Sequence, residues 1–445
     1  MENFFKRYIQ GDYVIWVVFL LLSLISLVEI YSAGSFFVNN KDNYTSELFR
    51  HGSFLVVGAL VALVIHRMNY KWTRLFIYLL LPISFIMLAI LVFIPNGFQI
   101  NAGGFTIIGT VSENEASRWM IFAGIKFQPS ELAKISVITF LADLYSKNPL
   151  KSYTISIIAK LFKKELTDKI SINIKFWLGV FVLSLFSALI AFDNLSTGIL
   201  LFGVGFLIMI LAKQPWLKIA FLTICLIGIV SIGYFTIDNV SSENLEKVGL
   251  SRAKTWVNRI NNFVDNKGEA KYAYTRETAQ VAHAQIAIAR GGFFGIMPGN
   301  SIERDYLPQA FSDFIYAIII EEMGLFGGII VILLYLILLY RAGIIAKKSN
   351  KDYYAFLVIG LTLMIILQAF ISIAVAANLG PVTGQPLPLL SRGGTSVVIT
   401  CMYIGIIQCI ARNINVENKT AVALEKVAIE NDNNNEAINK EIENS

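Results

Sequence analysis

Residues 325–340, LFGGIIVILLYLILLY, contain no charged side chain, and they decide the class of fold. They belong to an apolar run from 313 to 340, and a helix needs only about 20 apolar residues to cross the hydrocarbon core of a bilayer. Nine further runs of this kind occur along the chain: 13–34, 51–66, 75–95, 127–145, 176–193, 195–212, 216–236, 353–377 and 394–411. The sequence therefore predicts an all-α polytopic membrane protein with ten transmembrane helices.

The composition supports a membrane protein and excludes three soluble domains. Of the 445 residues, 56% are hydrophobic and 15% are charged, whereas an ordinary soluble domain has about 25% charged residues. The net charge of +6 is interpreted as a sign of orientation in the bilayer, and no nucleic-acid partner is expected. The three cysteines lie in apolar runs without metal-ligand spacing, and the three histidines are scattered, so no metal site is predicted.

Short segments rich in Lys and Arg alternate with short segments that hold few of them. Because basic short loops stay in the cytoplasm, this alternation predicts that both termini are cytoplasmic. Residues 237–312 then form a large extracytoplasmic loop between helices 7 and 8, and loops of this length tend to carry function. Residues 413–445 are rich in Asn and Glu, which predicts a disordered cytoplasmic tail after the membrane domain of residues 1–412.

Ionisable residues at membrane depth are costly, so each group of them marks a candidate site. The first group starts at Arg118 and continues with Gln128, Glu131 and Lys134. Glu131 and Lys134 are three residues apart and can pair on one face of a helix. Two interpretations stay open for them: an internal ion pair that lets this helix enter the membrane, or direct participation in a site.

Asp313 stands at the start of the eighth predicted helix, where a carboxylate can serve as the N-cap, and Asn194 is a cap candidate for the sixth. Glu321 and Glu322 follow deeper in the eighth helix. At 100° per residue, Glu321 lies about 80° and Glu322 about 180° from Asp313 around the helix. We therefore do not expect either glutamate to form a carboxylate pair with Asp313, whose own role, cap or functional group, stays open.

Two irregular segments lie at the predicted outer side. The first has glycines at 291, 292, 295 and 299, which indicates close backbone approach to another part of the molecule. The second, 381–396, has three prolines and places Ser391 and Arg392 just before the tenth helix. Irregular backbone at that depth needs protein cover or a water-filled cavity. Together the groups predict an outer polar cavity that handles an anionic amphiphile at the membrane surface.

Taken in order, these motifs resemble those of the SEDS family of shape, elongation, division and sporulation proteins over about residues 12–412. The matching segments are Arg118-Trp119, Gln128-Pro129-Ser130-Glu131 with Lys134, Asn194-Leu195-Ser196-Thr197, Gln280, Ala289-Arg290-Gly291-Gly292, Gly299-Asn300-Ser301, Tyr306-Leu307-Pro308, Ser312-Asp313-Phe314-Ile315, Glu321-Glu322-Met323-Gly324 and Gly384–Ser396. Departures from the family pattern occur at Asn194, Ser196, His283, Gln309 and Arg392, and none of them affects Asp313.

The resemblance implies a peptidoglycan glycosyltransferase that polymerises lipid II at the outer face of the bacterial plasma membrane. It implies that Asp313 is the general base that deprotonates the acceptor sugar hydroxyl. The substrate-binding candidates are Arg118, Gln128, Glu131, Lys134, Gln280, Arg290, Ser391 and Arg392. A divalent cation, Mg²⁺ or Mn²⁺, could assist, although the sequence shows no dedicated ligand cluster.

The implied partners are a class B penicillin-binding protein acting as transpeptidase and other membrane proteins of the division machinery. Thr383-Gly384 and Gly394-Thr395-Ser396 favour a division-type member over an elongation-type one. A lipid II flippase is the main alternative, but it needs a polar path to both faces. The recognised intramembrane charges are only Glu131, Lys134, Glu321 and Glu322. A non-catalytic scaffold is the third hypothesis, and it would not require Asp313.

Overall fold

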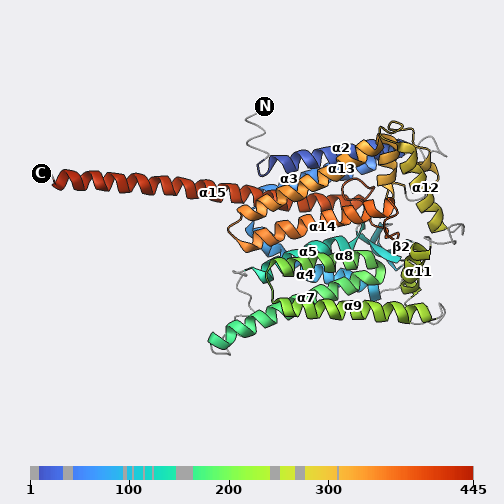
Figure 1. The fold of residues 1–445 in the computed structure, drawn as a ribbon, viewed down its shortest axis with the longest axis horizontal. Helices are drawn as coiled ribbons and strands as arrows, with labels where there is room; N and C mark the ends of the chain where they lie inside the picture. Colours follow the sequence, from blue (N-terminus) through green and yellow to red (C-terminus); the bar gives the residue numbers. More distant parts are fainter. Residues whose placement is uncertain are drawn as a thin grey trace.

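The computed structural model describes residues 10–33, 44–93, 98–102, 105–113, 116–122, 125–146, 164–240, 251–265, 276–307 and 310–443. Most of these residues form long helices that lie side by side in one bundle (Figure 1). The predicted helical membrane fold is therefore confirmed.

Eight helices in the described part of the chain are long and apolar enough to cross a membrane. They are α2 (Tyr13–Ala33), α3 (Tyr44–Arg67), α4 (Lys71–Phe93), α7 (Lys164–Asp193), α9 (Trp216–Asn239), α13 (Ile315–Lys348), α14 (Asp352–Ala376) and α15 (Gly394–Glu443). The other two predicted spans are also helices, α5 (Pro129–Tyr145) and α8 (Leu195–Leu211), with 17 residues each. Each predicted span thus has its helix, while the count of ten crossings stays a prediction.

A four-stranded antiparallel sheet between α4 and α5 was not predicted. Its strands are β1 (Gln99–Ala102), β2 (Phe105–Glu113), β3 (Ala116–Phe122) and β4 (Ile125–Phe127), in the order β1-β2-β3-β4. Val111 lies opposite Trp119, and Met120 lies opposite Phe127. The strands are rich in β-branched and aromatic residues, which favour sheets. Because this stretch contains no apolar run of membrane length, a loop is expected here, and the structure shows a sheet instead.

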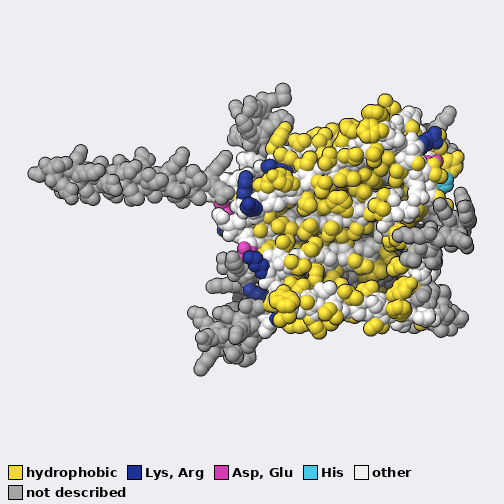
Figure 2. Space-filling model, viewed as in Figure 1, with side chains coloured by type: hydrophobic (Ala, Val, Ile, Leu, Met, Phe, Trp, Pro, Cys, Tyr) yellow, Lys and Arg dark blue, Asp and Glu magenta, His cyan; other side chains and the backbone are white. Residues whose placement is uncertain are grey.

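The two ends of the bundle differ in structure and in charge. One end carries the sheet, α11 (Ser251–Asp265), α12 (Arg276–Gly291) and the short 3-10 helix η3 (Glu303–Asp305), and we call it the sheet end (Figure 1). At the opposite end, which we call the basic end, Lys and Arg side chains gather beside the hydrophobic band (Figure 2). The basic residues of the connecting segments there include Arg67, Lys71, Lys213, Lys347, Lys348 and Lys351.

Helix α15 continues far beyond the bundle, to Glu443, although the composition predicted a disordered tail from residue 413. Residues 421–430, AVALEKVAIE, are mostly good helix formers, since Ala, Leu, Glu and Lys lose little freedom in a helix. This stretch contains no Asn, and the cluster of Asn residues, which are poorer helix formers, lies after it at 431–435. The structure therefore differs from the expectation of disorder.

Helix α14 lies in the centre of the bundle and packs against α13, α5, α8 and α15. Its Leu357, Leu361 and Met364 are fully buried. The pair α3 and α15 packs closely through small residues: a Cβ on Gly58 would lie 2.6 Å from Cys401 Sγ. Small residues at helix interfaces allow this approach in membranes. Cys401 is thus a small buried residue of this helix interface.

Candidate functional site

The segment Pro381–Gly393 between α14 and α15, here called the proline-rich loop, is hydrogen-bonded to the chain just before α13. Ser391 Oγ accepts from Leu387 N at 2.6 Å and donates to Ser312 O at 2.6 Å. The backbone N–H of Arg392 donates to Phe311 O at 2.8 Å. These bonds bring Ser391 and Arg392, both predicted site residues, next to Asp313.

Asp313 lies just before the start of α13, which packs against α12 of the sheet end, and it is partly exposed. Ser312 Oγ donates to Asp313 Oδ1 at 2.9 Å. Helix α13 begins at Ile315, and its N-cap position is Phe314, which makes no side-chain capping bond. Asp313 is therefore not the N-cap residue, and that interpretation is wrong. A partly accessible carboxylate beside a helix N-terminus can exchange a proton with a bound molecule.

Two outer elements hold the other end of the proline-rich loop. Gln385 Nε2 donates to Thr197 Oγ1 at 2.6 Å, at the start of α8. Asn194 accepts from Thr197 N at 3.2 Å, which confirms its predicted role as N-cap of α8. From α11, Arg259 Nη1 donates to Val382 O at 3.1 Å. The loop is thus fixed from both sides, as its prolines and glycines predicted.

The predicted ion pair of α5 is present. Lys134 Nζ lies 2.7 Å from Glu131 Oε1, and their side chains are only 1% and 9% exposed. Lys134 Nζ also donates to Gln368 Oε1 at 3.1 Å, and Gln368 Nε2 donates to Pro386 O at 3.0 Å. Because this chain of bonds ends on the proline-rich loop, the pair supports the backbone that carries Ser391.

The remaining predicted site residues lie on several elements of the sheet end. Gln128 directly precedes α5, and Gln280 lies on α12; both are partly exposed. Arg290, in the last turn of α12, has its Nε 3.9 Å from Glu321 Oε1. Arg118 lies on β3, and its side chain is outside the described part of the structure. The structure brings Asp313, Ser391 and Arg392 together and places Arg290 beside a buried carboxylate.

Helix α13 is broken at Gly324, which has φ of 73°. A turn after α12 fills the break: Ile296 N donates to Glu321 O at 3.0 Å, and Met297 N donates to Glu322 O at 2.9 Å. In return, Leu325 N donates to Gly292 O at 2.9 Å. The turn therefore replaces the helical hydrogen bonds that the break removes. A membrane protein requires this replacement, because backbone N–H and C=O groups inside the bilayer have no water to bond to.

The glycines of this turn explain how the backbone of one segment reaches the other. A Cβ on Gly295 would lie 2.2 Å from Glu322 O, and one on Gly291 would lie 2.0 Å from Ile320 O. The predicted close approach is thus confirmed, and its target is α13. The continuous eighth helix of the prediction is corrected, since α13 consists of a short segment, 315–323, and a long one after Gly324.

We expect Gly324→Ala to destabilise the protein by about 1–3 kcal/mol or more, because a side chain cannot adopt this backbone conformation without strain. The added Cβ would also lie 2.2 Å from Phe293 O. Gly343→Ala is the matched control in the same helix, where a Cβ meets nothing within 4 Å. It should be neutral or slightly stabilising. Melting temperatures in detergent test this, and equal effects of the two substitutions would contradict it.

Glu321 and Glu322 organise the loop before η3. Glu321 accepts from Ser301 Oγ and from Ile302 N. Glu322 accepts from Ser32 Oγ on α2 and from Ser301 N, and Arg304 Nη1 lies 3.7 Å from its Oε1. The two carboxylates thus bind the loop around Ser301. Their hydrogen bonds agree with the expectation that neither pairs with Asp313.

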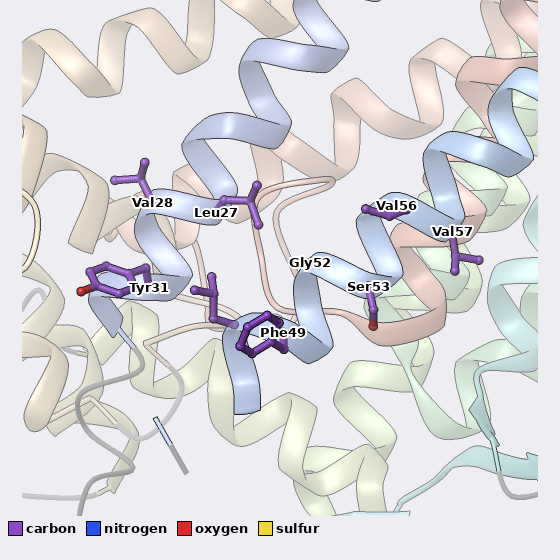
Figure 3. Close-up of a pocket in the computed structure, with 9 residues that line it drawn as sticks. Leu27, Val28, Tyr31, Phe49, Gly52, Ser53, Val56 and Val57 are labelled. Atoms are coloured by element: carbon purple, nitrogen blue, oxygen red, sulfur yellow. The ribbon is translucent and has the colours of Figure 1, made fainter. Parts of the chain in front are cut away.

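An apolar groove of about 700 Å³ opens between α2 and α3 at the sheet end (Figure 3). Its lining residues are Leu27, Val28, Tyr31, Leu48, Phe49, Gly52, Ser53, Val56 and Val57. Ser26, next to this lining, donates to Leu390 O at 3.1 Å, and its oxygen lies 2.8 Å from His51 Nε2. The groove therefore adjoins the proline-rich loop one residue from Ser391.

Residues 12–416 match the family described as "Cell cycle protein", the family of FtsW, RodA and SpoVE. The chain belongs to this family. It is 28% identical over 403 residues to stage V sporulation protein E of Bacillus subtilis, covering 90% of this chain and 97% of that protein. It is also 28% identical over 419 residues to a probable peptidoglycan glycosyltransferase FtsW of Coxiella burnetii, covering 91% and 98%.

Two solved structures share the fold. A chain from a peptidoglycan synthase complex has a TM-score of 0.63 and 20% identity, covering 91% of this chain and 98% of that one. The rod shape determining protein RodA of Thermus thermophilus has a TM-score of 0.55 and 18% identity, covering 92% and 98%. The match of residues 12–416 to the family confirms the resemblance inferred from the motifs.

Sequence reasoning missed several residues at this end. Gln368 and Gln385 are single amides in apolar surroundings, and Glu29 is the single charged residue of α2. For Gln368 and Glu29 the available signal was an isolated polar residue within an apolar run, whereas Gln385 lies in the irregular segment 381–396. Among the residues that the structure describes, no group of three or more His, Cys, Asp and Glu could hold a metal ion. The site therefore shows no protein cage for a divalent cation.

Proposed function

We propose that this protein is a peptidoglycan glycosyltransferase that polymerises lipid II at the outer face of the bacterial plasma membrane. The observation that carries the proposal is the partly exposed Asp313 held beside Ser391 and Arg392 by the proline-rich loop. Relatives named as probable peptidoglycan glycosyltransferases support the reaction class. Both termini are assigned to the cytoplasm, since the basic end then obeys the positive-inside rule.

In the proposed reaction, Asp313 takes the proton of the acceptor sugar hydroxyl as that oxygen attacks the anomeric carbon of the donor. The glycosidic bond to the lipid pyrophosphate breaks, and the pyrophosphate leaves with the bonding electron pair. General-base catalysis requires a carboxylate within hydrogen-bond reach of the hydroxyl. Asp313 suits this role because it lies at the sheet end and is accessible.

The groove between α2 and α3 suits the isoprenoid chain of such a substrate. Its residues are apolar or small (Figure 3), and Tyr31, Phe49 and Val56 among them are exposed. A chain lying there would remain in the apolar layer, while its pyrophosphate would reach the proline-rich loop. Because lipid tails are as apolar as the groove, binding of the chain there would depend on van der Waals packing and not on removal of apolar surface from water.

Arginine is proposed to bind the leaving pyrophosphate, because a planar guanidinium can bind two phosphate oxygens at once. The candidates are Arg392, Arg290 and Arg118. Arg392 directly follows Ser391, whose hydroxyl donates to Ser312 O, and its own backbone N–H donates to Phe311 O. We expect Arg→Lys at one or more of them to lower polymerisation on the order of tenfold without lowering expression. Wild-type rates in all three lysine variants would instead favour a divalent cation, Mg²⁺ or Mn²⁺.

A class B penicillin-binding protein is the proposed partner. A similar chain comes from a complex described as coordinating polymerisation and crosslinking, which supports this pairing. Because most of the named relatives are FtsW proteins, we propose a role in septal wall synthesis together with other membrane proteins of division.

The deciding experiment is reconstitution of the purified protein with lipid II and a transpeptidase partner. Formation of glycan chains is the expected result, measured by gel separation of labelled product. Transfer of fluorescent lipid II across the vesicle membrane without chain formation would favour a flippase. Neither chain formation nor transfer, with a partner known to bind, would favour a scaffold.

A further inference from the structure

The turn that follows α12, residues 292–297, is here called the phenylalanine turn, and its hydrogen bonds place it at the break in α13. On one side of the break, Phe326 N donates to Phe293 O at 3.2 Å. On the other side, Met297 N donates to Glu322 O at 2.9 Å. The phenylalanine turn therefore lies at the same depth in the membrane as the break.

The length of α13 gives this depth. Beyond the break at Gly324, the helix continues from Leu325 to Lys348, which is about 35 Å at 1.5 Å per residue. The hydrocarbon core of a bilayer is about 30 Å thick, so this segment alone can cross it. Its last turn carries Lys347 and Lys348 at the basic end, and these mark one edge of the core. The break and the phenylalanine turn then lie at the opposite edge.

The side chains of the phenylalanine turn are apolar and largely exposed. Phe293, Phe294 and Met297 are 56%, 79% and 68% exposed, and the two phenyl rings pack edge to face with centroids 4.9 Å apart. Leu325 and Phe326, the first residues of α13 after the break, are exposed beside them. Water would be an unfavourable environment for this apolar patch. At the edge of the hydrocarbon core the same side chains can enter the boundary between headgroups and acyl chains.

Met297 has a backbone conformation that a methionine disfavours. Its φ is 76°, in the left-handed region, where Gly or Asn is the usual residue. The conformation costs free energy, and the largely exposed side chain gains little packing within the protein in return. A contact outside the protein would offset this cost. Acyl chains of lipid offer such a contact at the depth where Met297 lies.

The backbone of the phenylalanine turn meets the requirement for entering an apolar layer. Gly295 N donates to Gly291 O at 2.8 Å, and Ile296 N donates to Glu321 O at 3.0 Å. Backbone groups that are bonded within the protein do not need water as a partner. The turn can therefore lie in lipid without leaving these N–H groups unsatisfied.

We infer that the phenylalanine turn inserts into the lipid at the sheet end and anchors the end of α12 to the membrane there. Its partner is the part of the acyl chains next to the headgroups, because the turn lies at the edge of the core and carries exposed apolar side chains. Part of the predicted extracytoplasmic loop, 237–312, is then held in the membrane and not in water. This inference does not depend on the proposed reaction.

A fluorescent label in place of the Phe294 side chain tests the insertion. An environment-sensitive NBD group is attached to Phe294→Cys in the full-length protein in lipid nanodiscs. Cys225 is replaced by Ala, while Cys401 and Cys409 are buried and stay. We expect emission at a shorter wavelength than in water. We also expect stronger quenching by lipids with a spin label near the headgroup end of the acyl chain than by lipids labelled near its far end.

Two further labelled positions are the controls. Ile227→Cys, at an exposed position in the middle of α9, should be quenched more strongly by the spin label at the far end of the acyl chain. Asp305→Cys, where the native side chain is charged and 53% exposed, should emit as in water and be quenched by iodide. Each labelled protein should keep the melting temperature of the unlabelled one, which shows that the label does not disturb the fold.

The inference is overturned if the label at position 294 emits and responds to iodide as the label at position 305 does. Shielding from both iodide and spin-labelled lipid would also overturn it, because protein would then cover the turn. A photoreactive phenylalanine analogue at position 294 gives a second measurement with a side chain close to the native one. In native membranes it should crosslink to lipid, whereas crosslinks to another protein without lipid adducts would contradict the anchor.

Discussion

Replacing Asp313 by Asn is expected to abolish polymerisation of lipid II while the protein still folds and inserts. Asparagine has nearly the same size, and its carbonyl oxygen can still accept the hydrogen bond from Ser312, which is 2.9 Å long in the wild type. It cannot act as a base near neutral pH. Loss of a general base lowers a rate by about 10²–10⁴-fold.

The measurement is the rate of glycan chain formation by purified protein at saturating lipid II. Asp305→Asn is the matched control, because that side chain is 53% exposed and lies in the same outer region. It should leave the rate within about twofold of the wild type, as surface changes usually have small effects. Wild-type polymerisation by the Asp313 variant would remove Asp313 from the reaction.

The second large effect is expected on stability, from Lys134→Met. The change leaves Glu131 as a buried negative charge without its partner, which lies 2.7 Å away in the wild type. Breaking a buried pair in this way costs about 3–5 kcal/mol. It also removes the donor to Gln368, whose amide supports Pro386 in the proline-rich loop. We therefore expect polymerisation to fall together with stability.

The double variant Glu131→Gln with Lys134→Met removes both charges and should recover most of the lost free energy of unfolding. Lys351→Met is the control, since Lys351 forms a pair of similar length, 2.6 Å, with Glu417, but its side chain is 47% exposed. Exposed pairs contribute only about 0–1 kcal/mol. Denaturant unfolding in detergent gives the free energy of unfolding of Lys134→Met, the double variant and Lys351→Met. A double variant no more stable than Lys134→Met would show that the pair is not the source of the loss.

The sequence alone determined the features that depend on residues close together in the chain. Each predicted apolar run is a helix, because a segment long enough to span the membrane must satisfy its own backbone bonds. The pair of Glu131 and Lys134 follows from a spacing of three residues in one helix. Asn194 caps α8 through the N–H three residues later. None of these required knowledge of a distant neighbour.

The tertiary structure decided whatever depends on residues far apart in the chain. Hydropathy along α13 gives no sign of the break at Gly324, which exists because the turn after α12 supplies the missing hydrogen bonds. The place of Ser391 beside the segment of Asp313 depends on the proline-rich loop, which lies beyond α14 in the chain and bonds to Ser312. In each case the partner is brought near only by packing of separate helices, and a local pattern contains no information about which helices meet.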